Sequence, residues 1–252
     1  MEKIPIAVQL YSVRDDCARD LPGVLEAIAK MGYEGVEFAG YYGFDAPALR
    51  TLLYDNGLKV AGCHVGIETL LGDELEKSIE FHRTLGNEYL IVPGLAAKYC
   101  DSTDAWRRTA RTMNEISAAL APHRMQTGYH NHTVEFKPFE PGGELPWDTF
   151  FGGTDPEVIM QFDTGNALHG GSDALPFLRR YPGRAVTVHL KEHSATNPTA
   201  LLGEGDVPFG AIFDICESTG GTKWYIVEQE SYAYPPLECI DRCLKHLRSL
   251  GK

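Results

Sequence analysis

Several features that assign a protein to a common class are missing from this sequence. It has no run of about 18 uncharged apolar residues, the length that a membrane-spanning helix needs, and residues 1–12 lack the apolar stretch of a signal peptide. Its six cysteines are scattered, without a Cys-x-x-Cys pair or the dense spacing of secreted disulfide-rich domains. We therefore expect a cytoplasmic protein with reduced cysteines and no membrane partner.

Positive charge is also scarce. The chain has 23 lysine and arginine residues against 35 aspartate and glutamate residues, a net charge of −12. Such a negative field repels phosphate backbones and anionic membrane surfaces. We therefore expect no nucleic-acid partner.

The length and composition favour one full-sized domain. The chain has 252 residues, of which 43% are hydrophobic and 23% charged, which excludes a disordered or fibrous protein. An α/β barrel spends roughly 30 residues on each strand–helix unit, so eight units would use the whole chain. We predict a single domain over residues 1–252.

Short β-branched or aromatic runs alternate along the chain with longer stretches whose apolar residues repeat every three or four positions. The runs predict strands over residues 4–11, 35–38, 59–64, 89–92, 126–130, 158–163, 185–190 and 224–228. The longer stretches predict helices over residues 21–31, 46–56, 73–85, 103–121, 174–180, 209–217 and 236–250, with a weak one near 147–151. This alternation is typical of βα units in a parallel sheet.

The segment after the first predicted strand distinguishes two parallel architectures. A doubly wound open sheet usually carries a glycine-rich dinucleotide loop at this point, whereas this chain has Tyr-Ser-Val-Arg at residues 11–14. The pattern therefore favours an α/β fold that consists of a single (β/α)8 TIM barrel.

Most of the predicted strands end in a polar side chain that is capable of chemistry. These residues are His64, His130, Asp163, His189 and Glu228. The carboxyl ends of barrel strands meet at one mouth, where active sites lie. Singly, Asp163 is also explained as a turn former or a helix N-cap, and His189 as a buried hydrogen-bonded histidine. Together with Glu228 they offer hard oxygen donors and an imidazole on consecutive strands, a set that suits a divalent metal.

At these strand ends the sequence resembles the sugar phosphate isomerase/epimerase superfamily of xylose isomerase-like barrels. The resemblance runs from Val-Gln-Leu-Tyr-Ser-Val-Arg at residues 8–14 to Val-Glu-Gln-Glu at residues 227–230. It implies one divalent metal ion, commonly manganese, with magnesium, cobalt and zinc as alternatives. It also implies ligands from strands five to eight in the order Glu, Asp, His, Glu. Asp163, His189 and Glu228 match the last three.

The fifth strand departs from this pattern. It ends in His130, and the nearest carboxylate is Glu135, in the segment Tyr-His-Asn-His-Thr-Val-Glu-Phe at residues 129–136. His130 and His132 share one face of an extended chain by its period of two. Two assignments stay open: Glu135 folds back as the fourth metal ligand, or His130 takes its place. The candidate catalytic residues are Glu135, Glu228, His130 and His132.

Four further polar residues are candidates for substrate binding. His64 ends the third strand, Glu37 lies on the second, and Glu204 lies in Leu-Gly-Glu-Gly-Asp at residues 202–206. Lys191 has the same parity as His189 and is placed to aim an ammonium group at a developing enolate oxygen. Each also has a structural explanation. His64 suits a buried hydrogen-bonded histidine, and Glu37 suits a carboxylate that orients a neighbouring side chain. Glu204 suits a tight turn, and Lys191 suits a surface ion pair with Glu192 or Glu230.

The resemblance implies a metal-dependent isomerase or epimerase that acts on a keto sugar through an enediolate. Ketose epimerases of this superfamily use two glutamates as an acid–base pair, and a histidine in place of one suits other proton transfers. The alternative is therefore a lyase or dehydratase that acts on an inosose or a 3-keto-glycoside. In both cases the partner is a small keto sugar or cyclitol, and a homodimer is a common assembly of such barrels.

Two remoter alternatives fit the sequence less well. An endonuclease IV-like nuclease would need a basic groove and more metal ligands, which the net charge of −12 and the short ligand set disfavour. A non-catalytic carbohydrate-binding barrel would not need the polar residues at the strand ends.

Overall fold

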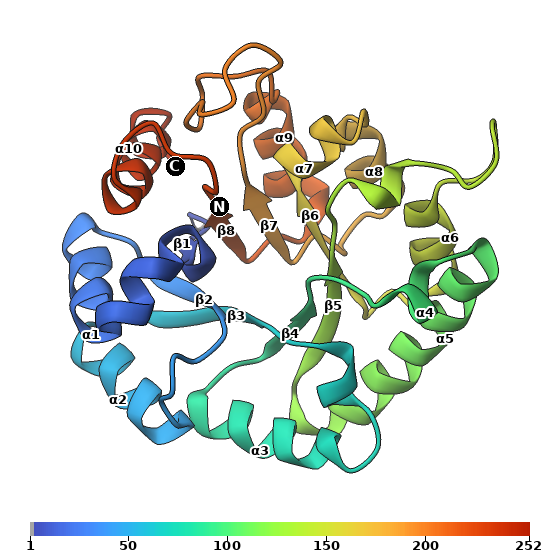
Figure 1. Ribbon diagram of the computed structural model, residues 1–252, viewed down its shortest axis with the longest axis horizontal. Coiled ribbons are helices and arrows are strands. Elements are labelled where there is room, and N and C mark those ends of the chain that lie inside the picture. The colour runs from blue at the N-terminus through green and yellow to red at the C-terminus, as the bar shows by residue number, and fades with distance from the viewer. Residues whose placement is uncertain (1–2) are drawn as a thin grey trace.

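The computed structural model describes residues 3–252. Over that range, eight parallel strands close into a barrel in sequence order, with β1 paired to β2 on one side and to β8 on the other. The helices form a ring around the strands (Figure 1). The predicted TIM barrel is confirmed.

The strands are short, as is typical of a barrel core. Their bounds are β1 Ile6–Gln9, β2 Gly35–Ala39, β3 Lys59–His64, β4 Tyr89–Val92, β5 Gln126–His130, β6 Ile159–Asp163, β7 Thr187–Leu190 and β8 Trp224–Val227. The main helices are α1 Arg14–Met31, α2 Ala46–Asp55, α3 Glu74–Leu85, α5 Thr103–Leu120, α6 Pro146–Gly153, α8 Ala174–Arg180, α9 Phe209–Ile215 and α10 Pro236–Ser249. Two shorter helices are α4 Ala97–Cys100 and α7 Thr164–His169.

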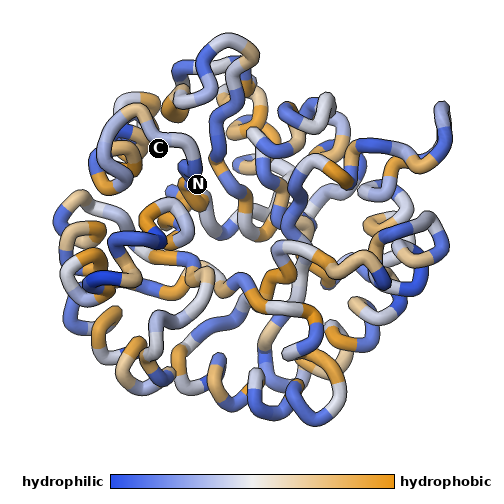
Figure 2. The backbone as a smooth tube through the Cα atoms, viewed as in Figure 1, coloured by the Kyte–Doolittle hydropathy of each residue, from blue (hydrophilic) through white to orange (hydrophobic). Residues whose placement is uncertain are grey.

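The helices carry both hydrophilic and hydrophobic positions along their length (Figure 2). This mixture is expected of helices that lay one face on a sheet and leave the other in water. Local signals set their ends: the Ser102 hydroxyl accepts the Ala105 N–H at the start of α5, and Gly86, with a φ of 86°, ends α3. None of the helices described combines the length and the apolarity that crossing a membrane requires.

The structure differs from the prediction at the end of β1, at the start of α1 and in one short helix that was not predicted. The strand predicted over residues 4–11 ends at Gln9, because the Gln9 side chain accepts the Tyr11 N–H and the chain turns into a 3-10 helix, Leu10–Val13. The helix predicted over residues 21–31 begins earlier, at Arg14, and its backbone leaves helical geometry at Asp20. The short helix α7 was not predicted. It follows β6 directly, and Asp163 caps it by accepting the Asn166 N–H at 2.6 Å.

The interior of the barrel changes from apolar to polar along its axis. A small apolar cluster in the interior of the barrel consists of Ala7, Ala61, Trp224 and Ile226. The alternate residues of β8, Tyr225 and Val227, belong instead to the main core between strands and helices. Gln9 lies two residues beyond Ala7 on β1 and is fully buried. Because alternate residues face the interior, the positions beyond the apolar cluster point toward the mouth. The strand-end residues of the candidate site occupy these positions.

Candidate active site

Side chains from β5, β6, β7 and the residue after β8 meet at the mouth of the barrel. The ligating atoms of His130, Asp163, His189 and Glu228 all lie within 4.8 Å of one another. His189 Nδ1 is 2.6 Å from Glu228 Oε2 and 3.8 Å from Asp163 Oδ2. All four side chains are buried. We call these four residues the metal cluster, because two carboxylates with two imidazoles form a set that suits a divalent transition metal.

Asp163 shows that this set fits a cation. Its Oδ1 accepts the Asn166 N–H, whereas its buried Oδ2 has no hydrogen-bond partner within residues 3–252. A buried carboxylate oxygen without a partner is costly. Burial raises the pKa of Asp163 to about 6, against the opposing charge of Lys191. A cation beside Oδ2 would supply the missing partner and favour the ionised carboxylate.

Glu37 holds the far side of the His189 imidazole from inside the barrel. His189 Nε2 lies 2.6 Å from Glu37 Oε2, the same oxygen accepts from Gln9 Nε2 at 2.8 Å, and Oε1 accepts from Gln161 Nε2 at 2.7 Å. His64 Nε2 lies 3.2 Å from the same carboxylate. The carboxylate therefore fixes the orientation of His189, with Nδ1 turned toward the cluster, as in metal sites whose histidine is held by a carboxylate.

The charges of Glu37 and His189 stabilise each other. Burial disfavours the carboxylate, but His64 and His189 outweigh it and hold the pKa of Glu37 well below its usual range. Burial also disfavours the imidazolium, but Glu37 and Glu228 outweigh it and raise the pKa of His189 to about 10. A metal ion bound at Nδ1 would replace that proton.

On the fifth strand the structure brings His130, and not Glu135, to the other members of the cluster. His130 Nδ1 lies 3.1 Å from Gln161 Oε1, and because an amide oxygen only accepts, Nδ1 carries the proton and Nε2 keeps its lone pair. Burial and the neighbouring imidazoles hold the pKa of His130 well below its ordinary value, which favours the neutral ring that binds metal.

Glu135 lies on the 3-10 turn Val134–Phe136 and is engaged there. The Tyr129 hydroxyl donates to Oε1 at 2.6 Å, and the His132 N–H donates to Oε2 at 2.9 Å. Burial raises the pKa of Glu135, against these two hydrogen bonds. Both oxygens thus shape the turn after β5.

A cavity of about 420 Å³, here called the inner cavity, opens over the metal cluster. It falls in the size range of small-molecule sites. Its polar lining includes Gln9, His64, His130, His132, Glu228 and Glu230. The Lys191 ammonium lies at its edge, 3.1 Å from Glu228 Oε1, and pairs also with Glu230. Although burial opposes it, Glu228 and Asp163 raise the pKa of Lys191, so the ammonium stays charged.

The structure places three of the predicted substrate-binding residues around the metal cluster and one away from it. His64, Lys191 and Glu37 are the first three. Glu204 is exposed and accepts the Leu201 N–H at 3.0 Å within its own turn. Its carboxylate therefore stabilises the loop after β7 and is not among the residues that line the inner cavity.

Two residues of the site were not singled out from the sequence. Gln161 connects Glu37, His64 and His130, and Gln9 is the other amide on Glu37. A signal was present, because Gln161 lies two residues before Asp163 on the same face of β6. An amide is a poor metal ligand, so a search for ligand types passes over it.

Comparisons with known proteins agree with this architecture. A family model described as xylose isomerase-like TIM barrel matches residues 25–250. An inosose dehydratase of Geobacillus kaustophilus is 27% identical, over 92% of this chain and 93% of that protein. Among solved structures, a sugar phosphate isomerase/epimerase from Parabacteroides distasonis has a TM-score of 0.86 at 22% identity and covers 99% of this chain and 95% of its own. The IOLI protein with a bound zinc atom has a TM-score of 0.73 at 14% identity, with 98% of both chains covered.

Proposed function

Since the chain belongs to the xylose isomerase-like TIM barrel family, we propose that it is a metal-dependent enzyme that removes a proton next to the carbonyl group of a keto sugar or keto cyclitol. The observation that carries this proposal is the buried Asp163 Oδ2, which lacks a partner among the described residues and lies 3.8 Å from His189 Nδ1. His130, Asp163, His189 and Glu228 would hold the ion. When bound, a divalent ion acts as a Lewis acid on a carbonyl or hydroxyl oxygen.

His132 is the base of the proposed reaction. It lines the inner cavity but does not belong to the metal cluster, and its ring lies 5.1 Å from that of His130. Burial lowers the pKa of His132, which favours the neutral imidazole that accepts a proton. The His132 N–H donates to Glu135, so the turn after β5 holds this residue in place.

Lys191 is the acid of the proposed reaction. Its ammonium lies between Glu228 and Glu230 at the edge of the inner cavity. A positive charge there stabilises an oxygen that becomes negative as the proton leaves.

Dehydration is the outcome that we propose for this step. The C–H bond next to the carbonyl breaks and its proton goes to His132. The C–O bond on the next carbon breaks, the hydroxyl leaves as water with a proton from Lys191, and a double bond forms between the two carbons. Support comes from the pair of His132 and Lys191 at one mouth and from the inosose dehydratase that matches nearly the whole chain.

Isomerisation or epimerisation is the second candidate. Two imidazoles, His64 and His132, line the same cavity, and a proton removed by one group can be returned elsewhere by another. The sugar phosphate isomerase/epimerase with a TM-score of 0.86 shares the fold that this would use.

The test is deuterium exchange in heavy water with manganese or zinc present, over a panel of inososes and keto sugars. Proton NMR reads the loss of the C–H signal, and an unsaturated product with the mass of water removed separates dehydration from epimerisation. We expect His132→Gln to keep its metal and to slow exchange by about 10²- to 10⁴-fold. The matched control is His123→Gln, on a partly exposed histidine of the 3-10 turn before β5. Stoichiometric metal without exchange from any substrate of the panel would show that the proposal is wrong.

A further inference from the structure

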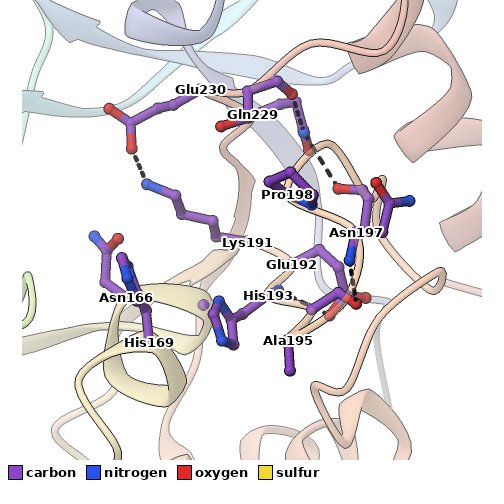
Figure 3. Close-up of a pocket in the computed structure, with 14 residues that line it drawn as sticks. Asn166, His169, Lys191, Glu192, His193, Ala195, Asn197, Pro198, Gln229 and Glu230 are labelled. Carbon is purple, nitrogen blue, oxygen red and sulfur yellow. Dashed lines mark hydrogen bonds and ion pairs between the residues drawn. The ribbon is translucent and has the colours of Figure 1, made fainter.

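A second cavity, which we call the outer cavity, adjoins the inner one. It has a volume of about 410 Å³ and lies between α7, the loop after β7 and the segment after β8 (Figure 3). Within residues 3–252, Glu230 is the one residue that lines both cavities. The outer cavity therefore begins one side chain away from the candidate metal cluster.

Two side chains form the boundary where the cavities meet. Lys191, on the outer side, points toward Glu230, as Figure 3 shows, and its ammonium also lies 3.1 Å from Glu228 on the inner side. An ion pair with a partly exposed partner is weak, and the Glu230 side chain is 35% exposed. A ligand that occupied both cavities would pass this ion pair.

Amides, hydroxyls and imidazoles make up much of the lining of the outer cavity, beside three charged residues, Lys191, Glu192 and Glu230. Asn166 and His169 come from α7, and His193 and Asn197 come from the loop after β7 (Figure 3). The rings of His169 and His193 stack at 5.1 Å with 15° between their planes. Amides and imidazoles offer both donors and acceptors, and no arginine lines this cavity among the described residues. This chemistry suits a ring with several hydroxyl groups better than a phosphate.

The wall of the outer cavity is held in place before any ligand binds. Glu192 accepts the N–H groups of His193, Gly203 and Val207 at 2.9, 2.8 and 3.1 Å, which ties together both ends of the loop after β7. Gly165 on α7 packs so close to this loop that a Cβ there would lie 2.7 Å from the Glu192 carbonyl oxygen. A wall that is already ordered lowers the entropy lost on binding.

We propose that the outer cavity binds a second, uncharged polyhydroxylated ring that is joined covalently to the keto ring in the inner cavity. The substrate of this chain is then a two-ring keto glycoside, and the linkage between its rings crosses at Lys191. On this substrate the carbon beyond the one that loses its proton carries the glycosidic oxygen in place of a hydroxyl. The bond from that carbon to the glycosidic oxygen therefore breaks, the second ring leaves as an alcohol with the proton from Lys191, and the double bond forms as in the proposed step. This inference rests on the proposed function, because it names the substrate class of the same site. Each cavity, at about 410 and 420 Å³, has room for one sugar ring.

The experiment compares two probes that share one keto ring, the methyl 3-keto-glycoside and the corresponding 3-keto-disaccharide. We expect kcat/KM for deuterium exchange to be at least about tenfold higher for the disaccharide. Ala195→Trp places an indole in the outer cavity and should reduce this ratio to about one, and His169→Ala should reduce it severalfold by removing the stacked ring. Thr196→Trp is the matched control, because Thr196 is exposed and outside the lining.

A binding measurement supports the kinetics. Saturation-transfer NMR on the metal-free protein, with the unoxidised disaccharide, should show contacts to both rings, and Ala195→Trp should remove those to the second ring. Exchange from both probes at equal kcat/KM would overturn the two-ring substrate and leave the proposed function standing. Exchange from an inosose or a keto sugar of the earlier panel, with none from either glycoside probe, would also overturn the two-ring substrate and leave the proposed function standing. Exchange from none of these compounds would overturn the proposed function.

Discussion

His189 Nε2 and Glu37 Oε2 lie 2.6 Å apart across the interior of the barrel, although their strands, β7 and β2, are not neighbours in the sheet. The Glu37 carboxylate also accepts hydrogen bonds from two side-chain amides, from Gln9 at Oε2 and from Gln161 at Oε1. Because each group is fully buried and each hydrogen bond is short, the imidazole has little freedom to turn. The geometry of the metal cluster thus depends on a residue that is not itself a ligand.

Replacement of Glu37 by glutamine keeps the size of the side chain and removes its charge. We expect Glu37→Gln to weaken manganese or zinc binding by about 10- to 100-fold, because the ligand loses the carboxylate that orients it and increases its basicity. Competition with a chromogenic chelator measures the affinity. Glu34→Gln, on a partly exposed glutamate just before β2, is the control, and an unchanged affinity in Glu37→Gln would contradict the role of the carboxylate.

The two carboxylate oxygens of Asp163 have different roles in our proposal: Oδ1 caps α7, and Oδ2 would bind the ion. A single substitution can therefore test metal binding without loss of the cap. Asp163→Asn keeps an oxygen to accept the Asn166 N–H and puts an amide NH2 in the place of Oδ2. We expect at least about 100-fold weaker metal binding, with the helix content of the protein unchanged. Elemental analysis gives bound metal and circular dichroism gives the fold. Full metal occupancy in this variant would remove Asp163 from the ligand set.

His130 and Glu135, the two candidate metal ligands after strand five, should differ in their effect on metal affinity when each is replaced by glutamine. His130→Gln removes an imidazole from the cluster and should lower metal affinity, whereas Glu135→Gln should retain the metal. The second change loses charge-assisted bonds from Tyr129 and His132 and should lower the free energy of unfolding by about 1–3 kcal/mol. Metal titration and urea denaturation of both variants test this. The reverse pattern would make Glu135 the ligand.

His82 gives the fold a dependence on pH that is independent of the active site. Burial lowers its pKa from 6.5 to about 4, and the ring accepts a hydrogen bond from Asn87. His82 binds a proton near pH 6.5 in the unfolded chain but only near pH 4 in the folded chain. The free energy of unfolding is therefore unaffected by His82 above pH 6.5 and falls as the pH drops from 6.5 toward 4, by up to about 3 kcal/mol.

His82→Gln keeps an acceptor for Asn87 but does not titrate. Urea unfolding of both proteins at pH 7.5 and pH 4.5 should therefore show a smaller loss of stability in the variant. An equal loss in the two proteins would contradict this assignment.

The barrel was predictable because each βα unit has a local pattern in the sequence. Each strand is an apolar run, each helix has its own period, and closure follows from their number. The end of β1 was not predictable from hydrophobicity, since Leu10 and Val13 extend the apolar run while the Gln9 side chain turns the backbone. The helix α7 was missed because Asp163-Thr-Gly suits a turn as well as a helix start, and the sequence left both explanations of Asp163 open; the structure confirms the helix N-cap.

The alternation of inward and outward side chains along each strand predicts part of the site. Asp163, His189 and Glu228 occupy equivalent inward positions on consecutive strands, so their proximity follows from the fold. The choice between His130 and Glu135 does not follow from parity. It depends on Tyr129, which faces the outer side of β5 and whose hydroxyl donates a hydrogen bond to the Glu135 carboxylate. The contact of Gln161 with Glu37 spans 124 positions of sequence and exists only once the barrel has closed.

The pairing of β1 with β8 also has a consequence for biosynthesis. A nascent chain that folds from its beginning holds β1 without its second neighbour until Trp224–Val227 has left the ribosome. Until then, β1 and the growing side of the sheet are open edges, which chaperones shield and which other nascent chains can join. The metal cluster draws its residues from the second half of the chain, and Glu228 is the last of them. The metal cluster is therefore complete only when the barrel closes, and a chain that stops before β8 keeps its open strand edges and lacks the last member of the cluster.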